Sequence, residues 1–230
     1  MINGDSRYSS ILRIILIVVD QAQFIDQITS GVESLGQELS PECVQKCAWL
    51  LCELDRWGAR MNLTAIRKPV AMVSGHVLDS LAMRPLICGK TLIDIGTGAG
   101  FPGLPIAISE PGVAVELLDS NARKIAFVQH MIGELEISNA TAVRSRAENY
   151  APGKRFDTVI ARALAPLPQL LELAGHLLAE EGVMLAQKGR YPAEELKELP
   201  DAWKYKVTEL AVPGLEVRHV ITLKRRKPDA

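Results

Sequence analysis

The chain has 230 residues, of which 48% are hydrophobic and 23% charged, and its formal net charge is −1. This composition supports a packed core and excludes wholesale disorder, and the length suits one large domain or one domain with an appendage. The near-neutral charge excludes a uniformly basic nucleic-acid binder, and the 5% content of aromatic residues argues against an extended base-stacking platform of the RRM or OB type.

The first twenty or so residues contain one apolar run, residues 11–19, which includes Arg13. The run is about half as long as a bilayer span requires, and no small-residue cleavage pattern follows it. We therefore predict no membrane element, and we treat residues 1–20 as an N-terminal extension of unknown role.

Residues 21–88 are predicted to form a helical N-terminal region. Residues 24–39 are loosely helical, and Ser40-Pro41 is a typical helix start. Apolar residues at helical spacing extend this second helix to Gly58, where it is expected to end. A third helix is expected over residues 70–87.

All four cysteines, Cys43, Cys47, Cys52 and Cys88, lie in this helical region, and none forms a C-x-x-C pair. Cys43 and Cys47 share a helix face, but no histidine nearby in the sequence completes a set of four ligands. We predict reduced thiols rather than a metal site, and hence a reducing compartment, the cytoplasm.

Residues 89–230 change to alternating strand and helix patterns, which predict a mostly parallel, doubly wound sheet. The expected parallel strands are residues 92–95, 113–118, 141–143, 156–161 and 183–186, and a crossover helix over 167–179 is expected to end at Gly182.

The last two expected strands, 206–212 and 217–223, are separated by only four residues. Because this connection is too short for a parallel crossover, we expect an antiparallel hairpin. A parallel sheet closed by an antiparallel last strand resembles the methyltransferase fold more than the dehydrogenase folds.

The stretch from Thr91 to Gly103 takes an apolar strand directly into a glycine-rich turn. Glycines allow positive φ and a close approach of a ligand to backbone N–H groups at a helix start. A dinucleotide fingerprint needs its third glycine where the chain has Phe101. The G-x-G-x-G pattern instead resembles motif I of the S-adenosylmethionine (SAM)-dependent methyltransferases, so Gly96 and Gly98 are candidate SAM-binding residues.

Asp119 ends the second expected strand about twenty residues after the glycine turn, where a carboxylate can accept both ribose hydroxyls of an adenosyl group. The alternative role is an N-cap for the next helix, which Ser120 or Asn121 could also supply. The loop 144–149, with Ala147 and Glu148, is expected beside the adenine or at the start of a short helix.

Arg162 directly follows the fourth expected strand, and Lys188 follows the fifth. At the ligand edge of the sheet, Arg162 is expected to bind the methionine carboxylate or a substrate phosphate. Lys188 is expected to bind a phosphate or to be a solvated loop residue.

Two motifs that are absent from the sequence narrow the range of possible methyl acceptors. The Asn/Asp-Pro-Pro-aromatic motif of exocyclic-amine methyltransferases is replaced by Arg162-Ala163-Leu164, and no cysteine follows the first strand to act as the nucleophile of carbon-five methylation. Direct in-line transfer to an atom with a free lone pair remains, and it depends on positioning more than on a base. No catalytic residue is identified.

The combined motifs resemble the RsmG (GidB) family of 16S rRNA guanine-N7 methyltransferases over roughly residues 24 to 224. The matching segments are residues 62–66, His76-x-x-Asp79-Ser80-Leu81, 94–105, 117–120 with Arg123-Lys124, 146–148, Arg162-Ala163, Lys188-Gly189 and Arg218-His219.

This resemblance implies a Rossmann-like SAM methyltransferase domain at 89–230 that methylates N7 of a guanine in 16S rRNA, free or in the small ribosomal subunit. By position, the implied SAM contacts are Gly96, Phe101, Ala147, Glu148 and Arg162. We expect a cytoplasmic monomer. The alternatives are a methyltransferase for a small molecule or protein, and a non-catalytic SAM-binding protein that associates with RNA.

Basic residues at the ligand edge are the candidate RNA contacts, and each of them could instead belong to a solvated charged face. The candidates are Arg60, Arg67, Lys68, Arg123, Lys124, Lys188, Arg190 and the tail Lys224-Arg225-Arg226-Lys227.

The chain departs from the family pattern at Gly75, where the family usually has arginine before the histidine. Arg67 or Arg84 is a possible substitute. His76 itself is expected to be a packing residue or an RNA-facing one, with packing slightly favoured.

Overall fold

The computed structural model describes residues 21–66 and 68–226. The predicted extension 1–20, the RNA-contact candidates Arg67 and Lys227, and the side chain of Arg60 lie outside the described residues.

A seven-stranded sheet in the order β3-β2-β1-β4-β5-β7-β6 forms the centre of the fold. The first five strands are parallel, whereas β7 is antiparallel to both β5 and β6, so the predicted mixed sheet and terminal hairpin are confirmed. The strands are β1 (Thr91–Ile95), β2 (Ala114–Asp119), β3 (Ala140–Arg144), β4 (Phe156–Arg162), β5 (Leu178–Lys188), β6 (Trp203–Leu210) and β7 (Arg218–Arg225).

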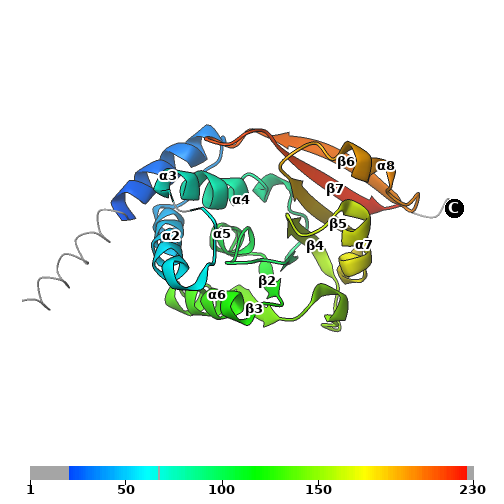
Figure 1. Ribbon diagram of the computed structural model, residues 1–230, viewed down its shortest axis with the longest axis horizontal. Helices are drawn as coiled ribbons and strands as arrows, with labels where there is room; N and C mark the ends of the chain where they lie inside the picture. The colour runs from blue at the N-terminus through cyan, green and yellow to red at the C-terminus, as the bar shows by residue number, and fades with distance from the viewer. Residues whose placement is uncertain (1–20, 67, 227–230) are drawn as a thin grey trace, which may run out of the picture.

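Helices cover both faces of the sheet (Figure 1). Residues 21–34 are helical, and the α-helices that follow are α2 (Pro41–Met61), α3 (Pro69–Met72), α4 (Asp79–Leu81), α5 (Gly103–Ser109), α6 (Ala122–Glu134), α7 (Leu167–Ala174) and α8 (Ala193–Lys197). A π-helical segment, Val73–Leu78, joins α3 to α4, and short 3-10 turns occupy Arg84–Leu86, Ala147–Asn149 and Gly175–Leu177.

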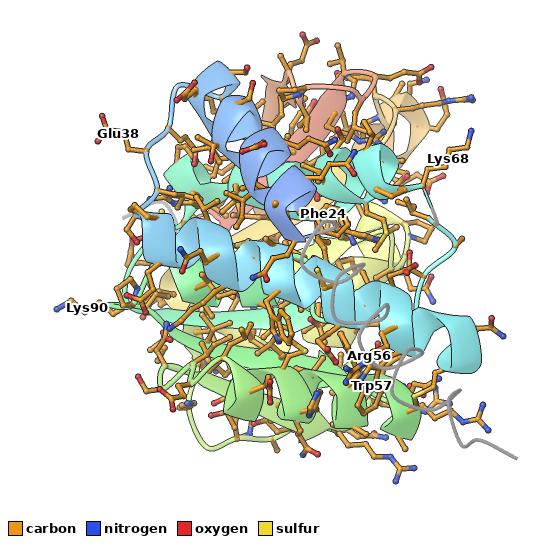
Figure 2. All side chains as sticks on the ribbon, turned by 90° about the vertical axis from the view of Figure 1, so that its left-hand side faces the viewer. Phe24, Glu38, Arg56, Trp57, Lys68 and Lys90 are labelled. Carbon is orange, nitrogen blue, oxygen red and sulfur yellow. The ribbon has the colours of Figure 1, made fainter. Side chains whose placement is uncertain are left out.

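The N-terminal helices share one hydrophobic core with one face of the sheet. Phe24 and Ile28 from residues 21–34, Leu51 from α2, and Leu117 from β2 belong to the same buried cluster. Figure 2 shows α2 crossing this face between the helix 21–34 and α6. A second buried cluster on the other face joins α7 to β4 and β5. The N-terminal region is therefore held against the sheet by apolar burial, although its division from residues 89–230 stays a prediction.

Four predicted helix ends were wrong. The first helix ends at residue 34 rather than 39, and α4 ends at Leu81 rather than continuing to residue 87. The N-cap of α2 is Ser40, as expected, but the helix passes through Gly58 and ends at Met61, where Asn62 adopts a left-handed conformation and its N–H donates to the Gly58 carbonyl. Gly58 is therefore a buried residue inside the helix rather than its end.

The crossover helix α7 ends at Ala174 rather than continuing toward Gly182. Leu178 is buried and pairs with Phe156, so residues 178–182 extend β5 through an irregular register. A Cβ at Gly182 would lie 3.0 Å from the carbonyl oxygens of Phe156 and Asp157, which explains a glycine inside this strand.

Candidate cofactor and acceptor site

The glycine turn follows β1 at the carboxyl edge of the sheet. Gly96, Gly98 and Gly100 have φ values of 67°, 61° and 91°, a region that favours glycine. Asp94 holds the turn closed, because its Oδ2 accepts a hydrogen bond from Thr97 Oγ1 at 2.6 Å and from the Gly103 N–H at 2.8 Å. The turn is therefore a preformed backbone surface.

Asp94 is fully buried, and its other carboxylate oxygen, Oδ1, has no hydrogen-bond partner among the described residues. Burial raises the pKa of Asp94 to about 6, against the opposing hydrogen bonds from Thr97 and Gly103. Ionisation of this carboxyl group therefore costs stability in the folded state.

The raised pKa of Asp94 predicts a measurable pH dependence of stability. A carboxyl whose folded pKa exceeds its unfolded value stabilises the fold below the unfolded pKa, and this contribution is lost as pH rises through the folded pKa. Wild type should therefore lose about 2 kcal/mol of unfolding free energy relative to Asp94→Asn when the pH rises from 4 to 6.5. Urea denaturation at both pH values measures the difference, and a pH-independent difference would contradict the assignment.

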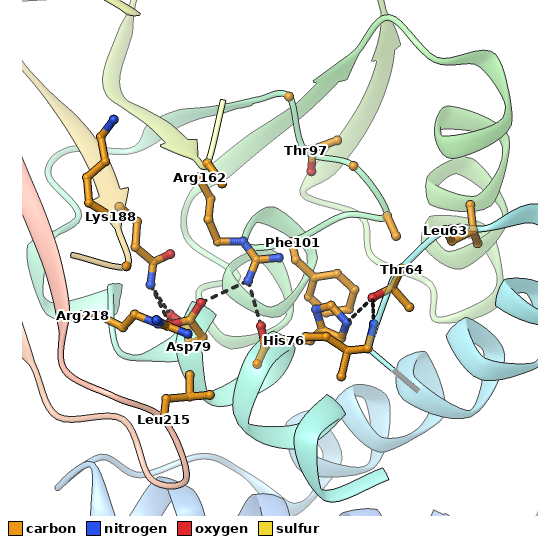
Figure 3. Close-up of a pocket in the computed structure, with 18 residues that line it drawn as sticks. Leu63, Thr64, His76, Asp79, Thr97, Phe101, Arg162, Lys188, Leu215 and Arg218 are labelled. Carbon is orange, nitrogen blue, oxygen red and sulfur yellow. Dashed lines mark hydrogen bonds and ion pairs between the residues drawn. The ribbon is translucent and has the colours of Figure 1, made fainter. Parts of the chain in front are cut away.

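A cavity of about 460 Å³ opens beside the glycine turn (Figure 3). Its walls come from the N-terminal region, the turn, and the carboxyl ends of β4 and β5, together with the start of β7. The volume and position are typical of a small-molecule site at the switch point of a doubly wound sheet. Of the predicted SAM contacts, Gly96, Gly98, Phe101 and Arg162 line this cavity.

Asp79 connects the strand ends that form the cavity wall. Its Oδ2 lies 3.1 Å from Arg162 Nη1, and its Oδ1 accepts a hydrogen bond from Gln187 Nε2 at 2.8 Å and lies 3.5 Å from Arg218 Nε. Arg162 Nη1 also donates to the Gly75 carbonyl at 2.8 Å. Burial raises the pKa of Asp79, and the two arginines oppose that shift. Arg162 is therefore already oriented at the cavity wall by Gly75 and Asp79 of the N-terminal region.

His76 lines the cavity and is packed, in agreement with the favoured prediction. Its ring stacks on Phe101 at a centroid distance of 4.6 Å, and its Nε2 lies 2.9 Å from Thr64 Oγ1. Thr64 Oγ1 also accepts a hydrogen bond from the Ile66 N–H, so this hydroxyl links the His76 ring to the backbone after α2. Burial and the nearby Arg162 lower the pKa of His76 to about 3, so its ring is neutral.

Asp119 lies at the carboxyl end of β2, next to the glycine turn. Its Oδ2 accepts from the Gly98 N–H at 3.0 Å, and its Oδ1 accepts from the Asn121 N–H at 2.8 Å. Asn121 is the N-cap of α6, accepting from Arg123 and Lys124 N–H groups, so the alternative capping role belongs to Asn121. The ribose role of Asp119 stays a prediction.

Ala147 and Glu148 form a 3-10 turn after β3, outside the cavity that the glycines line. The turn follows Arg144, the last residue of β3, which lies beside Asp119 in the backbone register of the neighbouring strand β2. Glu148 is exposed and lies 3.8 Å from Arg146. Asp119 therefore ends β2 and the Ala147-Glu148 turn follows β3 at the same edge of the sheet, and their contact with SAM stays a prediction.

The candidate RNA contacts differ in their surroundings. Arg123 and Arg190 are exposed. Lys124 lies 3.8 Å from Asp119. Lys188 lines the cavity, but its Nζ donates to Glu195 at 2.7 Å and to the Ala165 carbonyl at 2.8 Å. This ammonium therefore fastens the loop after β4 to α8, a role that the sequence did not reveal.

Arg84 is placed away from the cavity. It pairs with Glu110 at 2.7 Å and donates to Gln37 and to the Glu38 carbonyl. It cannot replace the arginine that the family usually carries at position 75, so that suggestion was wrong. A Cβ at Gly75 would lie 2.7 Å from Ile66 Cδ1, so the glycine permits close packing here.

Three further functional candidates line the cavity and were not predicted from the sequence, Asp79, Gln187 and Arg218. Asp79 and Arg218 lay within the motifs that carried the family resemblance, but nothing in their local sequence revealed that they meet. Gln187 carried no signal beyond its place at the end of a predicted strand.

The cavity suits a zwitterionic nucleoside ligand such as SAM. His76 Nδ1 and Gln187 Oε1 are buried without hydrogen-bond partners among the described residues, and both residues line the cavity. Buried polar atoms normally have partners, so unpaired groups in a cavity wall point to a polar ligand or bound water. Arg162 supplies a cation for a carboxylate. Among the described residues, no group of three or more metal-ligating side chains is placed to hold an ion.

The mixed sheet, the glycine turn and the cavity at its edge define the Rossmann-like class of SAM-dependent methyltransferases. Two solved structures share this fold at 16% identity: M. jannaschii TYW2 in complex with AdoMet (TM-score 0.51, 66% of this chain and 77% of that chain) and a precorrin-6y C5,15-methyltransferase from Geobacter metallireducens (TM-score 0.50, 72% and 92%).

The family model for rRNA small subunit methyltransferase G (GidB) matches residues 44–221, and the chain belongs to this family. A relative named ribosomal RNA small subunit methyltransferase G from Stenotrophomonas maltophilia is 43% identical over 85% of this chain and 92% of its own length. One of the same name from Idiomarina loihiensis is 39% identical over 87% and 98%.

Proposed function

We propose that the protein transfers the methyl group of SAM to N7 of a guanine in 16S rRNA, free or within the small ribosomal subunit. The cavity between the glycine turn and Arg162 supports this proposal most directly, because it joins a SAM-type backbone surface to a preoriented cation. Family membership and the names of the relatives support ribosomal RNA as the substrate.

SAM, when bound, supplies an electrophilic methyl group on a cationic sulfur. The backbone of Gly96 and Gly98 would hold its central part, Asp119 its ribose, and Arg162 its carboxylate. The Ala147-Glu148 turn would lie beside its adenine.

The lining side chains favour an acceptor that needs no general base. His76 Nε2 is engaged by Thr64, Asp79 is engaged by two arginines, and Lys188 is engaged by Glu195. N7 of neutral guanine carries an unprotonated lone pair, so in-line transfer requires alignment alone. The residues of this cavity would therefore act by binding, orientation and exclusion of water.

Incubation of the protein with labelled SAM and small ribosomal subunits tests the proposal, with naked 16S rRNA in parallel. Both substrates should come from cells that lack the protein. Nucleoside analysis should find labelled 7-methylguanosine on at least one of them. Label on neither substrate would refute the proposed activity, and label on a ribosomal protein would support a protein acceptor instead.

Arg162→Ala should weaken SAM binding about 10- to 150-fold, because a charge-assisted hydrogen bond to the carboxylate is worth about 1.5–3 kcal/mol. Calorimetric titration with SAM measures the change, after thermal unfolding has shown that the variant is folded. Arg56→Ala, at an exposed arginine on α2, is the matched control and should bind SAM as wild type does. An unchanged dissociation constant for Arg162→Ala would remove this arginine from the SAM site.

We infer a monomer that acts in the cytoplasm, where the proposed substrate is made. In the part of the chain that the structure describes, no helix has the length and apolarity to cross a bilayer. Analytical ultracentrifugation tests the oligomeric state.

A further inference from the structure

Three exposed apolar side chains belong to segments that line the cavity. Leu164 is 41% exposed and directly follows the lining residue Ala163, and Val217 is 48% exposed and directly precedes the lining residue Arg218. Tyr191, which is 54% exposed, lies two residues beyond the lining residue Gly189. Exposed apolar side chains on the segments around a pocket are candidates for an interaction site.

Tyr191 is the aromatic member of this group, and its ring is held in place. The ring packs edge-on against His219 at a centroid distance of 5.7 Å and an interplanar angle of 78°. His219 is fixed in the sheet opposite Lys188, and Pro192 and α8 follow Tyr191 immediately. A half-exposed ring with such fixed neighbours loses little conformational freedom when a ligand stacks on it.

The charges around Tyr191 have both signs. Glu194 and Glu195 of α8 pair with Lys197 and Lys188, and Glu209 lies 3.8 Å from His219 Nε2, which leaves Arg190 as the neighbouring cation without a partner among the described residues. Arg190 is exposed and has no ion-pair or hydrogen-bond partner among the described residues, and the Arg218 side chain is 26% exposed. Lys188 does not contribute, because Glu195 neutralises it. An aromatic face beside a free guanidinium matches the two parts of an unpaired nucleotide, its base and its phosphate.

We propose that Tyr191 stacks on an unpaired RNA base next to the acceptor guanine, while Arg190 pairs with a neighbouring phosphate. This inference rests on the proposed function, and it specifies the substrate as an RNA segment with an unstacked nucleotide beside the target. The low aromatic content of the chain is compatible with it, since one anchored ring serves one base.

Steady-state methylation of small subunits separates this role from a structural one. Tyr191→Ala should raise the KM for subunits about 5- to 150-fold, the range expected when one base–aromatic stack is lost. The SAM dissociation constant should not change, because Tyr191 does not line the cavity. Tyr191→Phe should behave as wild type, since stacking needs the ring and not the hydroxyl.

Tyr205→Ala is the matched control. Tyr205 is 49% exposed but pairs with Leu223, four residues along β7 from His219, which is about 13 Å. It should leave the KM unchanged. Equal KM values for Tyr191→Ala and wild type would overturn the inference, as would a loss in Tyr191→Phe equal to that in Tyr191→Ala.

A photo-cross-link identifies the partner directly. With p-benzoylphenylalanine in place of Tyr191, irradiation on small subunits should yield an RNA adduct, mapped by primer extension to within a few nucleotides of the methylated guanine. The same probe at position 205 should yield no such adduct. An adduct with a ribosomal protein instead would overturn the inference. A wild-type enzyme that methylates no RNA would refute the proposed function, whereas methylation with unchanged Tyr191→Ala kinetics would refute this inference alone.

Discussion

Asp79→Ala should lower the free energy of unfolding by about 2–4 kcal/mol. The substitution removes the carboxylate that meets Arg162 and Arg218, and it leaves the Gln187 amide without its acceptor. Breaking a fully buried ion pair costs more, but these arginine side chains are 23% and 26% exposed, so water compensates part of the loss. Urea denaturation followed by circular dichroism measures the change.

Two control variants separate the charge from other effects of the Asp79 substitution. Asp79→Asn keeps the shape and one acceptor oxygen, so its loss should be smaller than that of Asp79→Ala. Asp55→Ala, at an exposed position of α2, should change stability by less than about 0.5 kcal/mol. A loss below 1 kcal/mol for Asp79→Ala would show that the arginines are stable without this carboxylate.

Asp119→Ala should weaken SAM binding about 100- to 1,000-fold. Each carboxylate oxygen already accepts one backbone N–H, from Gly98 or Asn121, and retains a second acceptor position for a ribose hydroxyl. Two charge-assisted hydrogen bonds to the ribose are worth about 3–4 kcal/mol together, and the Gly98 backbone also loses its anchor. Titration calorimetry with SAM measures the affinity.

Ser120→Ala is the appropriate control, since Ser120 is the exposed neighbour of Asp119 and was an alternative capping residue. It should bind SAM as wild type does. If both variants lose affinity equally, the effect comes from the start of α6 rather than from a ribose contact. If Asp119→Ala binds normally, the ribose site lies elsewhere.

The parts of the fold that the sequence predicts correctly are those set by local chemistry. The strand around Ile93 is apolar because both faces of the sheet are covered, and Ser40 caps α2 because its hydroxyl accepts the Cys43 N–H. The connection between β6 and β7, residues 211–217, is too short for a parallel crossover and leaves a hairpin as the available pairing. The glycine turn is predicted for the same reason, since its backbone angles are a property of the turn itself.

The partners of the charged side chains in the cavity wall escaped prediction. Arg162 was expected to meet a ligand, but its carboxylate partner comes from residue 79 and its carbonyl partner from residue 75. Lys188 was expected to bind a phosphate or to be solvated, yet it pairs with Glu195, only seven residues further along the chain, in α8. Charge and periodicity do not encode which of several acidic residues a given cation will meet, so such pairs require the folded chain.

The position of β7 between β5 and β6 also determines when the cavity is complete during synthesis. β6 is made before β7 but pairs only with β7, so it has no strand to join until the end of the chain arrives. Arg218 then reaches Asp79 across more than half of the sequence, and Gln187 reaches it across 108 residues. Such long-range closures slow folding, and they make the cavity one of the last parts of the nascent protein to form.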